Sequence, residues 1–227
     1  MLRKWLAALL IAVLALTGTA LADAKVTVLG TGTVLMDADR ATIRVGVREL
    51  AEDVIAAQSS VNARIEAIVA ALEALGVGED ALSTDTISIY PNYEYSGETE
   101  RIAGYSAYNA LSVTIQDIDN VGKIIDAAFE AGANTLDSVT FSASDTAEAN
   151  HQALALAVKD AMEKAGVLAE AAGMTLGGIE SIRESGGYSY STPVKFARTE
   201  AAMDTATRVM ASRLEVSATV EVEFELK

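Results

Sequence analysis

The hydrophobic pattern changes its period along this chain, and that change is what most constrains the fold. Apolar and polar residues alternate over residues 41–47, 86–90, 110–115 and 216–226, which is typical of strands with one buried face. Apolar residues recur every three or four positions over residues 54–75, 121–129 and 145–173, which is typical of amphipathic helices. The chain is therefore predicted to mix strands and helices.

The order of these segments predicts an α+β fold. We expect the order β-β-α-β-β-α-β-α-β-β, with two long helices and one shorter helix packed on a mixed or antiparallel sheet. Gly30-Thr31-Gly32 and Asp37-Ala38-Asp39 have the composition of turns. The last helix is Ala-rich, and its predicted apolar stripe consists of Leu154, Val158, Met162, Ala165 and Leu168.

We expect the mature chain to form two interleaved sub-domains. One is predicted over residues 25–98 plus 210–227, and a ferredoxin-like α/β sub-domain is predicted over residues 99–185. Residues 186–209 are low in aliphatic side chains and are predicted to form a flexible loop.

The first 24 residues have the pattern of a secretory signal peptide. Arg3 and Lys4 precede an apolar run over residues 5–16, and small residues of the A-x-A type follow at Ala20-Leu21-Ala22 or Ala22-Asp23-Ala24. The run is shorter than the roughly 20 apolar residues that a membrane span needs. We therefore expect an exported protein of the periplasm, free or envelope-associated, with no stable transmembrane span after signal cleavage.

Composition excludes several kinds of chemistry. The chain has 32 acidic and 17 basic residues, a formal net charge of −15, and no Cys. This charge argues against a nucleic-acid partner, and the absence of Cys removes disulfides, thiolate zinc sites and thiol catalysis. The single histidine, His151, lies in the Ala-rich helix, and no G-x-S-x-G motif accompanies it. We therefore predict no catalytic residue, no metal site, no cofactor and no enzyme activity.

The predicted closing strand carries a row of like charges. Glu221, Glu223 and Glu225 lie on one face of this strand, where they repel one another unless cationic partners lie opposite. Arg44 and Arg48 alternate along an earlier strand and are the partners that we expect.

Tyrosine is the most unevenly distributed residue type. Five of the seven tyrosines lie on or beside the predicted hairpin of residues 86–115, and the other two lie in the irregular segment with Phe196. Tyrosine suits interfaces because it combines a large contact area with a polar end, but its ordinary strand propensity explains the same pattern. The candidate interface residues are Tyr90, Tyr93, Tyr95, Tyr105, Tyr108, Tyr188, Tyr190 and Phe196.

Six segments, taken in order, are similar to those of a known family. They are residues 26–34, 41–47, 89–93 with 104–111, 119–126, 157–173 and 216–226. The series resembles the SIMPL-domain family (DUF541) over essentially the whole mature chain. The resemblance implies a two-part α+β fold, a periplasmic or envelope location, assembly into large rings and an association with oxidative-stress tolerance. It implies no catalytic residue. One departure is Met210-Ala211-Ser212-Arg213-Leu214, where family members often carry Pro and Gly.

The sequence thus leaves two kinds of function open. The first is an exported, non-enzymatic envelope protein that assembles into a large homo-oligomer and contributes indirectly to stress tolerance. The alternative is a periplasmic module that binds a small molecule or a cation, because tyrosine faces and surplus carboxylates suit cations.

Overall fold

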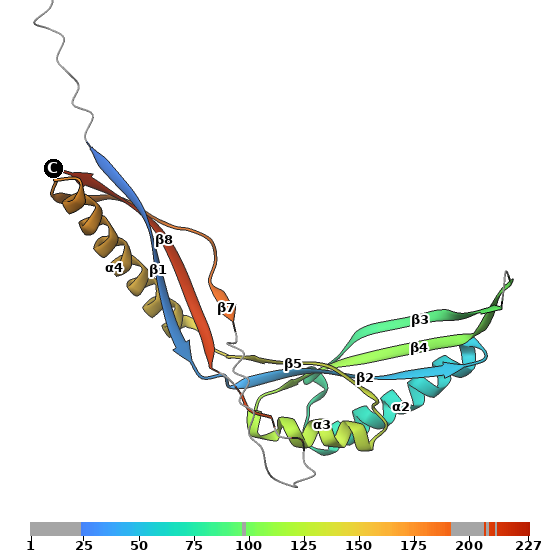
Figure 1. Cartoon of the computed structure of the whole chain (residues 1–227). Helices are drawn as coiled ribbons and strands as arrows, with labels where there is room; N and C mark the ends of the chain where they lie inside the picture. The colour runs from blue at the N-terminus through green and yellow to red at the C-terminus, as the bar shows by residue number, and fades with distance from the viewer. Residues whose placement is uncertain (1–23, 97–98, 192–206, 208, 212) are drawn as a thin grey trace, which may run out of the picture. The chain divides into compact units, whose positions relative to one another are not determined.

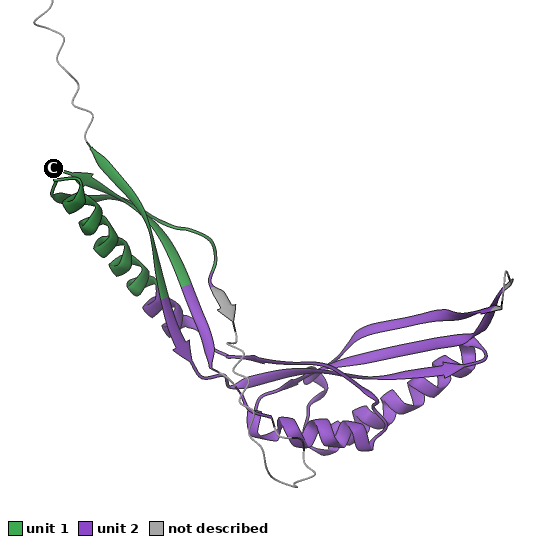
Figure 2. Cartoon of the chain, viewed as in Figure 1, with its two compact units in different colours: residues 1–32, 154–187, 218–227 green, residues 33–153, 188–217 purple. Residues whose placement is uncertain are grey.

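A computed structural model describes residues 24–96, 99–191, 207, 209–211 and 213–227 (Figure 1). The chain divides into two compact units (Figure 2). Unit 1 comprises residues 1–32, 154–187 and 218–227, and unit 2 comprises residues 33–153 and 188–217.

The order of the elements confirms the α+β class and the predicted series of strands and helices. The structure adds a short strand, β7, and two 3₁₀ turns, η1 and η2. The elements are β1 (Lys25–Met36), β2 (Arg40–Ala51), α2 (Val54–Ala74), η1 (Glu79–Ala81), β3 (Leu82–Ser96), β4 (Thr99–Ile115), η2 (Ile118–Asn120), α3 (Val121–Glu130), β5 (Thr135–Ser142), α4 (Ala147–Ala171), β6 (Leu176–Glu184), β7 (Ser189–Ser191) and β8 (Leu214–Leu226).

Unit 2 is built on a four-stranded sheet with the order β3-β4-β2-β5, in which all neighbours are antiparallel. The helices α2 and α3 lie on one face of this sheet (Figure 1). Every second residue of β2 faces them, because side chains alternate between the two faces of a strand. The resulting core includes Ile43 and Val45 from β2 with Ile68 and Leu72 from α2.

Local signals set the ends of α2. The side chain of Asp53 accepts a hydrogen bond of 2.9 Å from the backbone N–H of Ala56, so that one free donor of the first turn is satisfied. At the other end Gly76 has a φ of +87°, a left-handed conformation that favours glycine.

Unit 1 contains the greater part of α4, which packs on a sheet with the order β1-β8-β6; β7 also pairs with β8. The side chains of Val220, Val222 and Phe224 from β8 are buried in its core. They pack with alanines of α4 at four-residue spacing, of which Ala157 and Ala161 are fully buried.

The predicted apolar stripe of α4 is wrong at two positions. Met162 and Leu168 are 48% and 49% exposed, whereas Ala157, Ala161, Ala165 and Ala169 are all fully buried. The helix lies close to its sheet, so that the small side chains face inward and the larger ones do not fit there.

The predicted turn at Gly30-Thr31-Gly32 is also wrong, because all three residues lie inside β1. A Cβ atom on Gly30 would lie 2.0 Å from the backbone oxygen of Ala157. Gly30 is thus required by the close approach of α4 and not by a turn. The second predicted turn, Asp37-Ala38-Asp39, does separate β1 from β2.

The bounds of the two units differ from those of the predicted sub-domains, because β2 pairs with both β4 and β5. This pairing brings residues 40–51, 99–115 and 135–142 into one sheet. Of the predicted signal peptide over residues 1–24, only Ala24 is among the described residues, and most of the predicted loop over residues 186–209 also lies outside them.

Within the described ranges, each helix is too short or too polar to cross a membrane.

Candidate functional site

The long hairpin of β3 and β4 presents three of the predicted interface tyrosines to solvent. Tyr90, Tyr93 and Tyr95 all lie on β3, where Tyr90 is 63% and Tyr95 71% exposed. Ile102 on β4 is paired with Tyr93 and is exposed beside them. We call these four side chains the hairpin surface.

The backbone of β3 is free along one side, because β3 is the edge strand of its sheet. Three features interrupt this edge within the described residues. The register with β4 shifts between Thr84 and Thr86 and again between Asn92 and Tyr93, and Pro91 has no N–H to donate to a partner strand. A partner on the hairpin surface would therefore be held more by side chains than by a continuous backbone ladder.

The remaining predicted interface residues have other environments. Tyr105 packs partly buried against the core of unit 2, and Tyr108 is buried. Tyr188 is half-buried, and Tyr190 lies in β7 opposite Val216 of β8. Phe196 lies outside the described residues. The structure thus places only part of the predicted set on one surface.

Tyr108 is the centre of a polar cluster on the sheet. Its hydroxyl donates a hydrogen bond to Asp137 of β5, and the guanidinium carbon of Arg48 lies 4.5 Å from the centroid of its ring. Burial, together with the neighbouring Asp137 carboxylate, raises the pKa of the Tyr108 hydroxyl. Tyr108 therefore stays protonated at neutral pH and serves as a donor to Asp137.

Asn134 connects the start of β5 to the same strand as Arg48. Its side-chain oxygen accepts from the Arg48 backbone N–H at 2.7 Å, and its amide group donates to the Arg48 carbonyl at 2.8 Å. These two bonds extend the contact between the two strands beyond their last paired residues, Gly46 and Thr135.

A cleft of about 540 Å³ lies in unit 2, beside the C-terminal end of α2. Its charged side chains are Asp80, Asp117 and Lys123, and its apolar ones include Leu75 and Ile124. Asp117 is already engaged in capping, because it accepts bonds from the Asp119 backbone N–H and the Asn120 amide. The cleft therefore offers one uncommitted carboxylate, Asp80, together with the Lys123 ammonium group.

The chain contacts α3 again shortly before β8. Asp126 accepts hydrogen bonds from the backbone N–H of Thr207 at 3.1 Å and from its hydroxyl at 2.6 Å. A Cβ atom on Gly122 would lie 2.2 Å from the Thr207 carbonyl oxygen. Residue 207 is thus held directly on α3 in unit 2.

The predicted partners of the glutamate row are wrong. Glu221 pairs with Arg183 of β6 at 2.8 Å, and Glu223 and Glu225 pair with Lys25 and Lys227 at 3.7 Å and 3.6 Å. Arg44 pairs instead with Asp85 at 2.7 Å. The error arose because β2 and β8 belong to different sheets.

Among the described residues, no group of three or more His, Asp or Glu side chains is arranged to hold a metal ion. His151 is exposed on α4. The described residues thus offer contact surfaces and a cleft.

Sequence reasoning missed Asp137, Asn134 and the lining of the cleft. No motif marks these residues, since each is brought into place by the pairing of β2 with β5 or by the end of α2. The sequence does show arginine at positions 40, 44 and 48, and this spacing places the three arginines on one face of a strand.

Comparison with known proteins gives a consistent result. The family model named SIMPL, described as a protein of unknown function (DUF541), matches residues 26–224. The chain is 27% identical over 213 residues to the 26 kDa periplasmic immunogenic protein of Brucella melitensis biotype 1, covering 90% of this chain and 85% of that one. It is 26% identical over 174 residues to the uncharacterized protein YggE of Escherichia coli K12, covering 76% and 71% of the two chains. It is 28% identical over 155 residues to YggE of Edwardsiella ictaluri, covering 68% and 65%.

Proposed function

Because this chain belongs to the SIMPL family of proteins of unknown function, we propose that it is an exported envelope protein that acts through its surfaces and assembles into a large homo-oligomer. The basic start and apolar run of residues 1–24 support export, and a relative that is named periplasmic supports that location. In this proposal the protein catalyses no reaction and binds its partners by contact.

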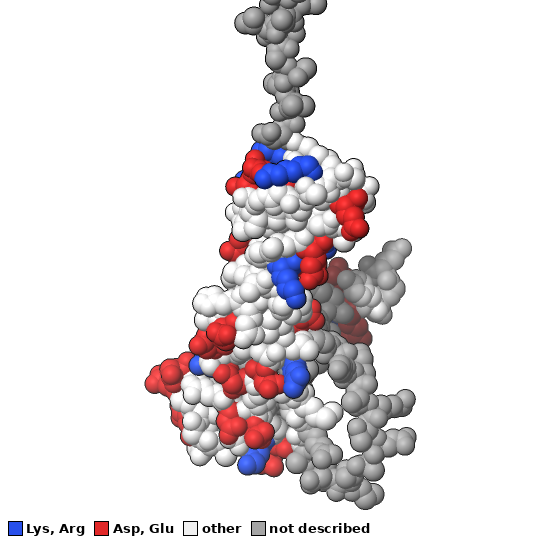
Figure 3. Space-filling view, turned by 90° about the vertical axis from the view of Figure 1, so that its left-hand side faces the viewer, with Lys and Arg blue, Asp and Glu red and all other residues white. Residues whose placement is uncertain are grey.

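The hairpin surface is the observation that carries this proposal. It gathers Tyr90, Tyr93, Tyr95 and Ile102 on one face of an exposed hairpin. Exposed aromatic and aliphatic groups that lie together mark contact sites in soluble proteins. A chain with a net charge of −15 repels its own copies, so that assembly needs buried apolar contacts of this kind. Figure 3 shows acidic groups spread over one face of the molecule.

The test is the mass of the exported chain in solution. Multi-angle light scattering at moderate salt should give a mass several times that of one chain. Changing Tyr90, Tyr93 and Tyr95 together to Ser should lower this mass, because these side chains would no longer bury apolar area between copies.

A matched control changes Ile179 and Ile182 to Ser. These residues are exposed apolar side chains of β6 in unit 1, and we expect this variant to keep the mass of the original protein. A strictly monomeric original protein, or an equal loss of mass in the control, contradicts the proposed role of the hairpin surface.

We further propose that any contribution to oxidative-stress tolerance is indirect. The chain has no Cys, so reversible thiol oxidation is not available to it. A strain lacking the gene should then lose tolerance without losing peroxide-consuming activity in its periplasmic extract.

The cleft supports a second candidate function, the binding of a small cationic or zwitterionic molecule. The Asp80 carboxylate can bind an ammonium group of a ligand, and the Lys123 ammonium group can bind a carboxylate group. Both side chains line the same cleft of about 540 Å³. A thermal-shift screen with amines and amino acids should raise the melting temperature of the original protein and leave the Asp80→Asn variant unchanged. Asp119→Asn is the control, because Asp119 does not line this cleft.

A further inference from the structure

One face of the sheet in unit 2 points away from α2 and α3. Its side chains are polar and cationic along β2 as far as Arg48, and beyond Arg48 the exposed Leu50 and the hairpin tyrosines lie on the same face. Arg40, Arg44 and Arg48 of β2 lie on this face, because the alternate residues of β2 are buried against the helices. Hydroxyl side chains lie on both sides of this row. By register they are Thr114 and Thr140 beside Thr42, Ser112 and Ser138 beside Arg44, and Ser142 beside Arg40. We call this surface the arginine face.

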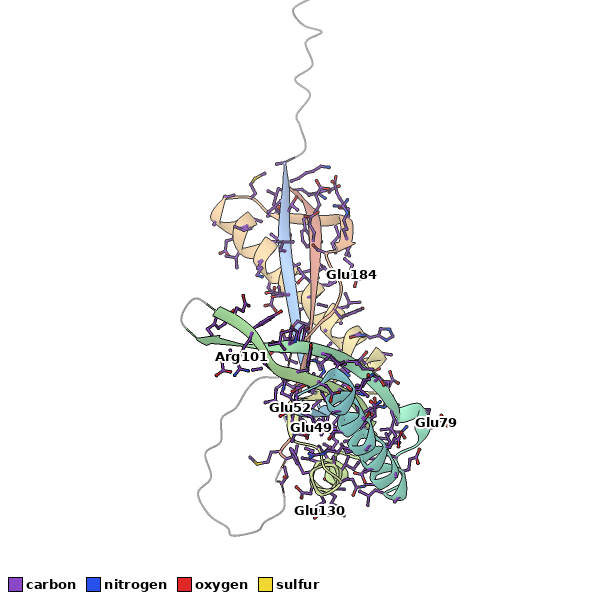
Figure 4. The ribbon with its side chains drawn as sticks, turned by 90° about the vertical axis from the view of Figure 1, so that its right-hand side faces the viewer. Glu49, Glu52, Glu79, Arg101, Glu130 and Glu184 are labelled. Carbon is purple, nitrogen blue, oxygen red and sulfur yellow. The ribbon has the colours of Figure 1, made fainter. Side chains whose placement is uncertain are left out.

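Charge is segregated between the two sides of unit 2. The helical side carries many carboxylates and few cations, since α2 and α3 contribute only Arg64 and Lys123 as basic residues. The carboxylates of α2, η1, η2 and α3 are Glu66, Glu73, Glu79, Asp80, Asp119, Asp126 and Glu130. Figure 4 shows Glu79 and Glu130 at the ends of these helical elements.

The carboxylates nearest the arginine face are already engaged. Asp85 pairs with Arg44, and Asp137 accepts a hydrogen bond from Tyr108. Most Lys and Arg side chains of the described residues form ion pairs, whereas Arg40 and Arg48 on this face, and Lys123 on α3, form none. The arginine face therefore keeps cationic groups open to a ligand in a chain that is otherwise strongly acidic.

We propose that the arginine face binds a linear acidic polysaccharide, and this proposal does not depend on the self-assembly proposed above. The three arginines recur every four residues, so that their Cα atoms are about 13 Å apart along a row of about 27 Å. They match carboxylates that recur along a chain, because a guanidinium group binds a carboxylate through two parallel hydrogen bonds. The Ser and Thr hydroxyls between them both donate and accept, as sugar hydroxyls do.

The net charge favours a narrow ligand over a broad anionic surface. A lipid bilayer would face the whole acidic molecule, with its formal charge of −15, and would be repelled. A single polysaccharide chain meets only the local charge within about 10 Å, where the arginines dominate.

The experiment is a calorimetric titration of the original protein with oligogalacturonate long enough to span the row. We expect binding that weakens as salt is raised from low ionic strength to physiological ionic strength. Changing Arg40, Arg44 and Arg48 together to Gln should weaken it about tenfold or more. Neutral dextran should not bind.

The matched control removes three positive charges elsewhere, with Arg64, Lys159 and Arg183 changed to Gln. All three form ion pairs outside the arginine face, and we expect their loss to leave binding within about twofold. A second variant, Thr140→Glu, keeps every arginine and places a negative charge on the face; it should weaken binding while the melting temperature stays near that of the original protein.

Several results would overturn the proposal. They are an absence of oligogalacturonate binding, equal weakening in the control, equal binding of dextran, or stronger binding to vesicles of anionic lipid. A change in particle mass in the variant with three arginines replaced would also overturn it, because this face would then be covered by a second copy of the chain.

Discussion

The two units both pack helices on a sheet, but they fill the space between the layers differently. In unit 2 large side chains such as Ile43, Ile68 and Leu72 are fully buried between sheet and helices. In unit 1 the face of α4 that meets the sheet is made of alanines, and the Ala157 backbone approaches Gly30 of β1 directly. One core is thus filled by branched side chains and the other by close backbone contact.

The difference predicts opposite sensitivities to mutation. A core of large side chains is damaged most by removing atoms, because a cavity remains. A core held by close backbone contact is damaged most by adding atoms, because nothing can move aside without separating the layers. The following experiments test this comparison.

The largest effect is expected for Ile68→Ala in α2. Its side chain is fully buried in unit 2, so we expect the free energy of unfolding to fall by about 2–5 kcal/mol. Denaturant titration followed by circular dichroism measures this change. Ile55→Ala is the control on the same helix, where the side chain is 76% exposed, and it should change stability by less than about 0.5 kcal/mol. Equal effects at the two positions would refute the assigned core.

Adding one methyl group in unit 1 should have the next largest effect. Gly30→Ala should lower the free energy of unfolding by about 1–3 kcal/mol, since the new Cβ would meet Ala157 and Ala161. Gly166→Ala in α4 is the matched control, because no atom lies within 4 Å of its added Cβ. This control should raise stability by about 0.5–1 kcal/mol. A gain in stability from both variants would show that α4 does not pack closely on β1.

Tyr108→Phe tests the polar cluster of unit 2 and should have a smaller effect. We expect a loss of about 1 kcal/mol at neutral pH, because Asp137 loses its hydrogen-bond donor. The pKa of Tyr108 is raised above its ordinary value of 10.0, so its contribution is present below pH 10 and is lost as pH rises through the raised value. Melting temperatures from pH 8 to pH 12 should fall more for the original protein than for Tyr108→Phe.

The smallest effect is expected from surface carboxylates, one in each unit. The Lys164 ammonium group and the Thr31 backbone N–H lower the pKa of Asp160 in unit 1, and hydrogen bonds from Ser144 lower the pKa of Asp39 in unit 2. Each lowered pKa adds stability above about pH 4 that is lost as pH falls through the folded-state value. Asp160→Asn and Asp39→Asn should each flatten the fall of the melting temperature below pH 4, and an unchanged slope would count against these contacts.

The contact of Asp160 and Lys164 with β1 also bears on the comparison of the two units. Asp160 accepts from the Thr31 backbone N–H at 2.7 Å, and Lys164 donates to the Leu29 carbonyl at 3.0 Å. Side chains of α4 thus form hydrogen bonds with backbone groups of β1 that would otherwise be free to pair with another strand. The outer edge of β3 is instead interrupted by two register shifts and by Pro91.

The order of strands and helices could be predicted because hydrophobic period is a local property. β8 alternates strictly over residues 214–224, and α2 shows the three- and four-residue steps of a helix with one buried face. The hairpin was predicted from its two alternating segments, although β3 and β4 prove longer than those segments.

The errors arose where the outcome depended on distance between elements. Hydrophobicity placed Met162 and Leu168 on the inner face of α4, but the short separation of helix and sheet selects alanine. Gly30 lies in a Gly-Thr-Gly segment that is typical of a turn. In the structure it packs against α4, at Ala157, which is more than 120 residues away in sequence. The partners of Glu221 could not be found because strand pairing, and not spacing along the chain, brings Arg183 beside it.

The sequence by itself determined the types of the elements, their order, the acidic charge and the absence of thiol chemistry, because each follows from composition or from the period of neighbouring residues. Only the tertiary structure decided which tyrosines are exposed, which carboxylates have partners and where three arginines meet a row of hydroxyls. These outcomes depend on strand register and on the separation of packed layers, which are set by contacts between residues far apart in the chain.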